Sequence, residues 1–256
     1  MRQALSKAVI ESEIASRFHS AFKRRAKTSA EVISAGVTEV DALTGGLPRG
    51  AITEIFGPAS SGRTSLMLAA LAYASNHDEV CALIDTSNTF DPMSATNAQM
   101  DLDRLLWVRC DGKLEHAFKA ADLLLQGGGF GLVVLDLGDV PAQQARRVIS
   151  SWWYRFRRVV ENKPTALVVI AADSCVRSCA AMTLEMKKEL GVWSSTTSVM
   201  AEFDHHQSYM PVILRASGYR VVRQRPIGLL PTEVRVYANS NPKEQILPQE
   251  RSLRLA

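Results

Sequence analysis

The chain has 256 residues, of which 46% are hydrophobic and 22% are charged, a balance typical of a globular protein with a sizeable core. It contains no apolar run as long as a membrane span, and its basic N-terminus lacks the apolar stretch of a signal peptide. We therefore expect no membrane partner, with an amphipathic transit peptide at the N-terminus as the alternative. The four cysteines lack the spacing of a zinc site, and a reduced cytoplasm is the simplest compartment for them. The net charge of +4 is too small to indicate a nucleic-acid partner by itself.

Residues 3–27 are predicted to form a helix, because large apolar residues recur every four positions: Ile10, Ile14, Phe18 and Phe22. Basic residues crowd the same stretch: Arg17, Lys23, Arg24, Arg25 and Lys27. An apolar stripe of this kind usually packs on its own domain, but residues 26–32 are polar enough to act as a tether. We expect residues 1–32 to be a helix and linker that dock on another subunit, with packing on the chain's own core as the alternative.

The core domain, residues 33–238, alternates short apolar runs with helices. The predicted strands are residues 51–56, 80–84, 132–135 and 166–171, and the predicted helices are residues 65–74, 114–125 and 142–160. Strands that are apolar throughout and alternate with helices indicate an α/β fold, in which helices flank both faces of a twisted, mostly parallel sheet.

The C-terminal part of the chain has a different pattern. Residues 212–214, 220–223 and 233–237 are predicted to form shorter strands, which suggest an antiparallel edge of the sheet. Residues 239–256 are polar and contain two prolines, so we expect a flexible tail there.

The segment between the first predicted strand and helix has the spacing of a phosphate loop. Its sequence is Gly57-Pro58-Ala59-Ser60-Ser61-Gly62-Arg63-Thr64, which fits G-x4-G-x-[ST], and Ser65 opens the helix. Glycines let successive backbone N–H groups turn inward and bind an anion at a helix N-terminus. The motif has lysine where this chain has Arg63, whose planar guanidinium attracts phosphate with a different geometry. We expect a site for ATP or ADP; a strand–helix turn without a ligand is the alternative.

Asp136 directly follows the apolar strand 132–135. A carboxylate at the carboxyl end of a parallel strand points into the ligand crevice of such a sheet. With the phosphate loop present, we expect Thr64 and Asp136 to bind the Mg²⁺ that accompanies the nucleotide. An ordinary aspartate at a strand end is the alternative.

For other clusters we favour a structural interpretation. Cys175 and Cys179 lack a second pair of zinc ligands, and the adjacent His205 and His206 point in different directions on a strand. Trp152 and its aromatic neighbours lie among arginines, as in proteins that stack on single-stranded DNA, but a helix at this position more often packs them on the sheet.

A second basic cluster lies near the C-terminus and comprises Arg215, Arg220, Arg223 and Arg225. Solvated surface is the simplest explanation for any one cluster. We expect Arg220, Arg223 and Arg225 to act together with the N-terminal basic residues and to give modest, sequence-independent affinity for single-stranded DNA.

Several segments resemble bacterial RecA in order and spacing, over roughly residues 30–175. They are residues 33–41, 45–50, 54–58, 60–62, 81–85 and 90–92, with the helix around Trp152 before the strand at 167–170. The resemblance implies a RecA-type core, bound ATP with Mg²⁺ and a function in DNA repair.

Three departures from RecA fall on residues with chemical roles. Arg63 replaces the lysine of the phosphate loop, and Ser87 replaces the glutamate that orients the attacking water. The strand that ends in asparagine and glutamine in RecA ends here in Ala171, Ala172 and Asp173. Serine cannot act as a carboxylate base, and loss of a positioned base lowers a rate about a hundredfold or more. We therefore expect no ATPase activity or a very weak one.

The overall pattern, including Val221-Val222-Arg223, is most similar to the ImuA type of RecA-like protein. That resemblance implies an accessory role in translesion DNA synthesis during the SOS response, with nucleotide binding that is weak or lost. The implied partners are a catalytically defective Y-family-like protein, a second replicative-type polymerase, the sliding clamp or RecA. The alternatives are an active ATP-dependent recombinase and a nucleotide-independent regulator that pairs with RecA through the N-terminal helix.

Overall fold

The computed structural model describes residues 31–148, 150–189, 192–195 and 212–239. The predicted N-terminal helix, His205, His206 and all but the first residue of the predicted tail lie outside these ranges. The chain divides into two compact units, Met1–Glu31 and Val32–Ala256, and nearly all described residues belong to the second. Within the described ranges, no helix combines the length and apolar character needed to cross a membrane.

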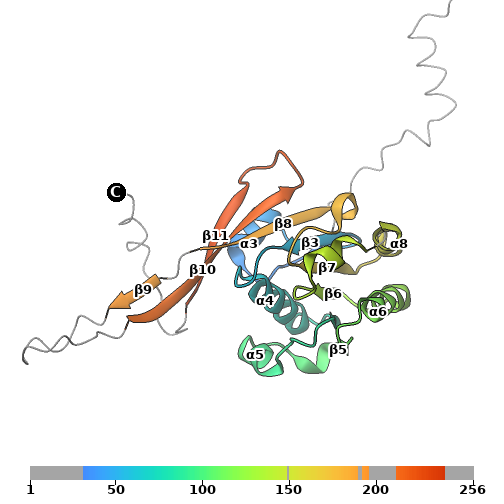
Figure 1. Ribbon diagram of the computed structural model, residues 1–256, viewed down its shortest axis with the longest axis horizontal. Coiled ribbons are helices and arrows are strands. Elements are labelled where there is room, and N and C mark those ends of the chain that lie inside the picture. Colours follow the sequence, from blue (N-terminus) through green and yellow to red (C-terminus); the bar gives the residue numbers. More distant parts are fainter. Residues whose placement is uncertain (1–30, 149, 190–191, 196–211, 240–256) are drawn as a thin grey trace, which may run out of the picture. The chain divides into compact units, whose positions relative to one another are not determined.

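A nine-stranded sheet forms the centre of the second unit (Figure 1). Its strands are β3 (Ile52–Phe56), β4 (Cys81–Asp85), β5 (Leu105–Arg109), β6 (Leu132–Leu137), β7 (Ala166–Ala171), β8 (Met182–Lys188), β9 (Val192–Ser195), β10 (Val212–Arg225) and β11 (Glu233–Asn239). The strand order is β11-β10-β8-β3-β7-β6-β4-β5, and β9 also pairs with β10. Neighbours from β8 to β5 are parallel, whereas β9, β10 and β11 pair antiparallel. The predicted α/β fold with a mostly parallel sheet and an antiparallel edge is confirmed.

Helices cover both faces of this sheet (Figure 1). They are α3 (Thr38–Thr44), α4 (Arg63–Asn76), α5 (Pro92–Asn97), α6 (Leu114–Gly127), α7 (Ala142–Arg146) and α8 (Ser150–Val160), with 3-10 helices η1 (Leu102–Arg104) and η2 (Arg177–Cys179). A second, two-stranded pairing joins β1 (Val32–Ile33) to β2 (Leu47–Pro48).

Two hydrophobic cores lie on opposite faces of the central strands, because successive residues of a strand point to opposite sides. Along β6, Leu132 and Val134 pack with α3, α4 and α5, whereas Val133 and Leu135 pack with α6, α7 and α8. Both faces of the strand are therefore dry, which explains why β6 and β7 are apolar throughout.

The four cysteines are free and buried within these cores. Burial raises the pKa of the Cys81 thiol to about 12, with the carboxylate of Glu79 adding to the shift. Burial also raises the pKa of Cys175, next to the carboxylate of Glu54. Both thiols therefore stay protonated at neutral pH and act as apolar core side chains.

The predictions for two segments of the chain are wrong in their extent. The single helix predicted over residues 142–160 is two helices, because the backbone tightens after α7 to bonds between residues three apart, from Arg147 N–H to Gln144 and from Val148 N–H to Ala145. The separate strands predicted at 212–214 and 220–223 are one strand, β10, because residues 216–222 pair without interruption with β11.

Most of the aromatic cluster of α8 packs in the core, against Phe118 of α6. Phe156 is fully buried and lies against Phe118, Trp152 and Trp153, at ring-centroid distances of 5.6, 5.7 and 6.0 Å. Tyr154, on the same helix, is 56% exposed. The helix therefore contributes one apolar face to the core.

We predict that Phe156→Ala lowers the free energy of unfolding by about 3–5 kcal/mol, because it removes a fully buried ring and leaves a cavity. Tyr154→Ala, the matched control on the same helix, should change it by about 0.5 kcal/mol or less. Urea denaturation monitored by tryptophan fluorescence measures both values. Equal losses would contradict the packing described for α8.

Candidate phosphate-binding site

The predicted phosphate loop joins the carboxyl end of β3 to the N-terminus of α4, at the middle of the sheet. Strand β3 lies between β7 and β8, and β6 and β4 follow on the same side as β7. The parallel register pairs Asp136 of β6 with Asp85 of β4, so both carboxylates lie at the carboxyl edge of the sheet. This is the edge at which open α/β sheets bind ligands.

Two glycines of the loop approach neighbouring strands too closely for any side chain. A Cβ added to Gly57 would lie 2.2 Å from the carbonyl oxygen of Met186 in β8. Gly62 has a φ of +91°, and its added Cβ would lie 2.6 Å from two ring atoms of Tyr219 in β10. Tyr219 is itself buried, which raises its pKa to about 12. The loop backbone thus rests directly on β8 and β10.

The N-terminus of α4 offers backbone donors to a ligand. Its N-cap, Gly62, has no side chain to satisfy the first N–H groups of the helix, and such groups bind anions. The hydroxyl of Ser61 is buried and has no hydrogen-bond partner among the described residues. A loop whose glycines are tightly packed, a helix N-terminus without a side-chain cap and an unpaired hydroxyl together fit a phosphate group.

The remaining loop side chains lie at the surface of this site. Pro58, Ala59 and Ser60 are exposed, and Ser60 has a φ of +59°, so the loop turns sharply there. Thr64 and Ser65 are exposed in the first turn of α4. Their hydroxyls are therefore accessible from solvent beside the helix N-terminus.

Arg63 turns toward β6 rather than outward. The residue is 8% exposed, and its Nη1 donates to the carbonyl of Gly138, 3.2 Å away. The N–H of Gly138 donates in turn to Asp136 Oδ1 (2.8 Å). The pKa of Asp136 is raised to about 6, mainly by burial and also by the charges of Asp85 and Asp139. The hydrogen bond from the Gly138 N–H and the charge of Arg63 act in the opposite direction.

Asp85 organises the loop that carries Ser87. Its carboxylate accepts hydrogen bonds from the N–H groups of Thr89 (3.1 Å) and Phe90 (3.0 Å) and from the indole of Trp107 (3.2 Å). Ser87 lies in this ordered loop and is partly exposed. Ser87, which we predicted to replace the water-orienting glutamate of RecA, thus lies in a loop shaped by hydrogen bonds to Asp85 and offers a hydroxyl rather than a carboxylate.

The segment after β7 is held by a buried carboxylate that sequence reasoning did not single out. Glu54 of β3 is fully buried, and its Oε1 accepts from the N–H groups of Cys175 (2.6 Å) and Val176 (2.8 Å). Its Oε2 accepts from the hydroxyl of Ser174 (2.8 Å). The one sequence signal for this role is a glutamate inside an otherwise apolar strand.

Asp173, two residues beyond the end of β7, forms an ion pair with Arg146 of α7. The pair joins the segment after β7 to the segment after β6, and both side chains are partly exposed.

The three arginines predicted to bind DNA have different environments. Arg223 is buried, and its guanidinium donates to the carbonyls of Leu43, Leu229 and Pro231, so it has a structural role. Arg220 forms ion pairs with two glutamates, at 2.9 and 3.6 Å, which offset its charge. Arg225 is exposed and donates to one carbonyl, that of Arg177 (3.2 Å).

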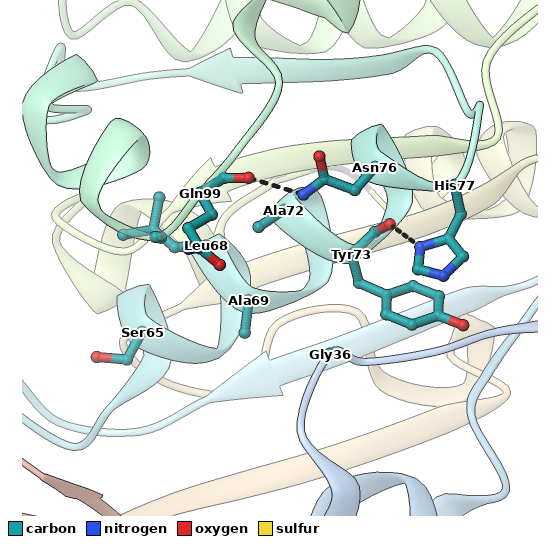
Figure 2. Close-up of a pocket in the computed structure, with 10 residues that line it drawn as sticks. Gly36, Ser65, Leu68, Ala69, Ala72, Tyr73, Asn76, His77 and Gln99 are labelled. Carbon is teal, nitrogen blue, oxygen red and sulfur yellow. Dashed lines mark hydrogen bonds between the residues drawn. The ribbon is translucent and has the colours of Figure 1, made fainter. Parts of the chain in front are cut away.

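A separate cleft of about 480 Å³ runs along the outer face of α4 (Figure 2). Ser65 lies at one end, and Tyr73 and His77 stack at the other with their ring centroids 3.9 Å apart. Figure 2 shows Asn76 donating to the carbonyl of Gln99 (2.7 Å) and the His77 ring contacting the carbonyl of Tyr73 (2.7 Å). These polar groups already have partners, so the cleft does not present a set of groups for catalysis.

A phosphate loop between a parallel strand and a helix, with aspartates at the carboxyl ends of β4 and β6, defines the class of P-loop α/β proteins. The chain matches the RecA N-terminal domain family over residues 3–148 and belongs to that family. It is also 33% identical over 156 residues to Protein RecA of Wigglesworthia glossinidia brevipalpis, an alignment that covers 55% of this chain and 47% of that protein. The chain therefore spans about half the length of this curated relative.

We predict that Gly62→Ala destabilises the chain more than Gly45→Ala. Both glycines have a left-handed φ, which costs an alanine about 1–2 kcal/mol, but an added Cβ at Gly45 meets no atom within 4 Å, whereas at Gly62 it meets Tyr219. Thermal melting of the two variants makes the comparison. Equal melting temperatures would mean that Tyr219 does not support the loop.

Proposed function

We propose that this member of the RecA family is an accessory protein in DNA repair. It binds ATP or ADP at the phosphate loop and hydrolyses ATP slowly or not at all. The observation that carries the proposal is the contrast between two neighbouring segments. The loop from Gly57 to Thr64 keeps the glycines and donors of a phosphate site, whereas the ordered loop after Asp85 carries Ser87 where a water-orienting carboxylate would be needed.

The residues of the site fit a nucleotide better than they fit its metal. The N–H groups at the start of α4, the hydroxyls of Ser61 and Thr64 and the guanidinium of Arg63 would hold the phosphates. Thr64 and Asp136 are the oxygen ligands that Mg²⁺ would use. However, Asp136 already accepts from Gly138 and has the charge of Arg63 nearby. Bound Mg²⁺ would supply charge neutralisation to the phosphates.

Within DNA repair, we propose translesion synthesis in the damage response as the process. The resemblance to the ImuA type supports this role, together with the changes at positions 63, 87 and 172 on a RecA-type core. The proposed partners are the polymerase proteins of translesion synthesis, the sliding clamp or RecA. The apolar stripe Ile10, Ile14, Phe18 and Phe22 is the proposed docking element, and it lies outside the described residues.

We expect ATP to raise the melting temperature of the purified chain while its turnover, with or without single-stranded DNA, stays far below one per second, a typical enzyme rate. A coupled phosphate-release assay measures turnover on the same sample. Ser87→Glu combined with Arg63→Lys is the companion variant, and any rise in turnover would support the assignment of position 87. Turnover of ATP near one per second in the unmutated chain would contradict the accessory role.

For DNA, we expect Arg225 to contribute more than Arg220, because its charge has no carboxylate partner among its described contacts. Binding to single-stranded DNA should weaken steeply with salt, by roughly 0.7 log units per phosphate contact per log unit of salt. Arg225→Ala should reduce that slope, measured by fluorescence anisotropy. A slope near zero for the unmutated chain would remove these arginines from consideration.

A further inference from the structure

Arg63 and Asp136 approach each other on either side of Gly138. Arg63 is the first residue of α4, and its Nη1 donates to the Gly138 carbonyl. A Cβ built on Gly138 would lie 3.7 Å from Arg63 Nη1 and 2.9 Å from Asp136 Oδ1. The guanidinium is therefore a near neighbour of the carboxylate that was predicted to bind the metal.

This arrangement differs from that of the lysine form of the loop. There, the lysine reaches the phosphates, and the metal is held beside the aspartate. Here, the side chain at the lysine position has turned to the side of the aspartate. An arginine is permanently charged, so a divalent ion placed beside Asp136 would be repelled by a neighbouring cation in a poorly solvated site.

Asp85, which pairs with Asp136 in the register of the sheet, offers no free replacement ligand. Asp85 accepts from Thr89, Phe90 and Trp107, and these bonds shape the loop that contains Ser87. Taking Asp85 as a metal ligand would compete with these contacts. The donor set at the edge thus suits a fixed guanidinium better than a second, exchangeable cation.

We propose that Arg63 takes the place of Mg²⁺ at this site, so that the chain binds the phosphates of a nucleoside di- or triphosphate without a divalent ion. The proposal rests on the nucleotide binding proposed above. Arginine has five N–H donors, and among the described contacts Gly138 takes one of them. The rest of the planar fork suits a bidentate contact with phosphate oxygens, and the exposed hydroxyl of Thr64 donates to phosphate directly.

The first test is calorimetric titration of the full chain with ATP, once with excess Mg²⁺ and once with EDTA. The expected dissociation constants agree within about twofold in the two buffers, a difference of well under 1.4 kcal/mol. Binding in Mg²⁺ alone would overturn the proposal and leave the proposed function standing. Absence of binding in both buffers would overturn both.

The second test uses Arg63→Lys, which keeps the charge but shortens its reach and removes the fork. In EDTA its affinity for ATP should fall about tenfold, and Mg²⁺ should restore it. Arg104→Lys is the control, because Arg104 precedes β5 at the opposite edge of the sheet and pairs with Asp78 and Asp101. It should bind ATP like the unmutated chain in both buffers.

A variant with the same affinity as the unmutated chain in EDTA would also overturn the proposal. Far-UV circular dichroism and melting establish that Arg63→Lys is folded before it is titrated. Because the first comparison uses the unmutated chain, the proposal stays testable even if the variant does not fold.

Discussion

The phosphate loop depends on direct contact between its backbone and two strands that come much later in the chain. Gly57 lies against the backbone of Met186 in β8, and Gly62 lies against the ring of Tyr219 in β10, with no room for a Cβ at either position. Protein interiors are packed closely, so such contacts fix a shape that the loop sequence alone does not determine. The loop is therefore a property of the whole sheet, including strands beyond residue 148, where the family match ends.

The strand that carries the loop also holds the segment after β7. Glu54 lies in β3 and accepts donors from Ser174, Cys175 and Val176, and a buried carboxylate is stable only when its oxygens are satisfied in this way. A shift of β3 that follows binding at the loop would change these hydrogen bonds. The two segments are thus linked through one side chain rather than through a long chain of contacts.

The sequence predicted most of the central sheet, because its strands are buried on both faces and are therefore apolar throughout. The segments 132–135 and 166–171 agree closely with β6 and β7, and the spacing of the phosphate loop located the turn between β3 and α4. The edge strands were harder, since no residue of β5 is buried and the described side chains of β10 range from buried to exposed. The break between α7 and α8 was missed because no glycine or proline marks it.

The candidate site was predicted in part. Loop glycines and a strand-end aspartate have local signatures, so Gly57, Gly62 and Asp136 were found from spacing. The partners of long side chains depend on tertiary packing, which is why the buried position of Arg223 and the role of Glu54 were not foreseen. The same applies to Arg63, whose identity was visible in the sequence but whose contact with Gly138 was not.

Each face of the sheet has buried cysteine thiols whose chemical labelling can report when that face opens. Cys81 lies in the core beneath α4, whereas Cys110, Cys175 and Cys179 lie in the core beneath α6 and α8. Alkylating reagents attack the thiolate, and a buried, protonated thiol reacts only when the structure around it opens. The rate at which each thiol is labelled therefore follows the opening of its own core. The opening rates of the two cores can thus be measured separately in the unmutated chain.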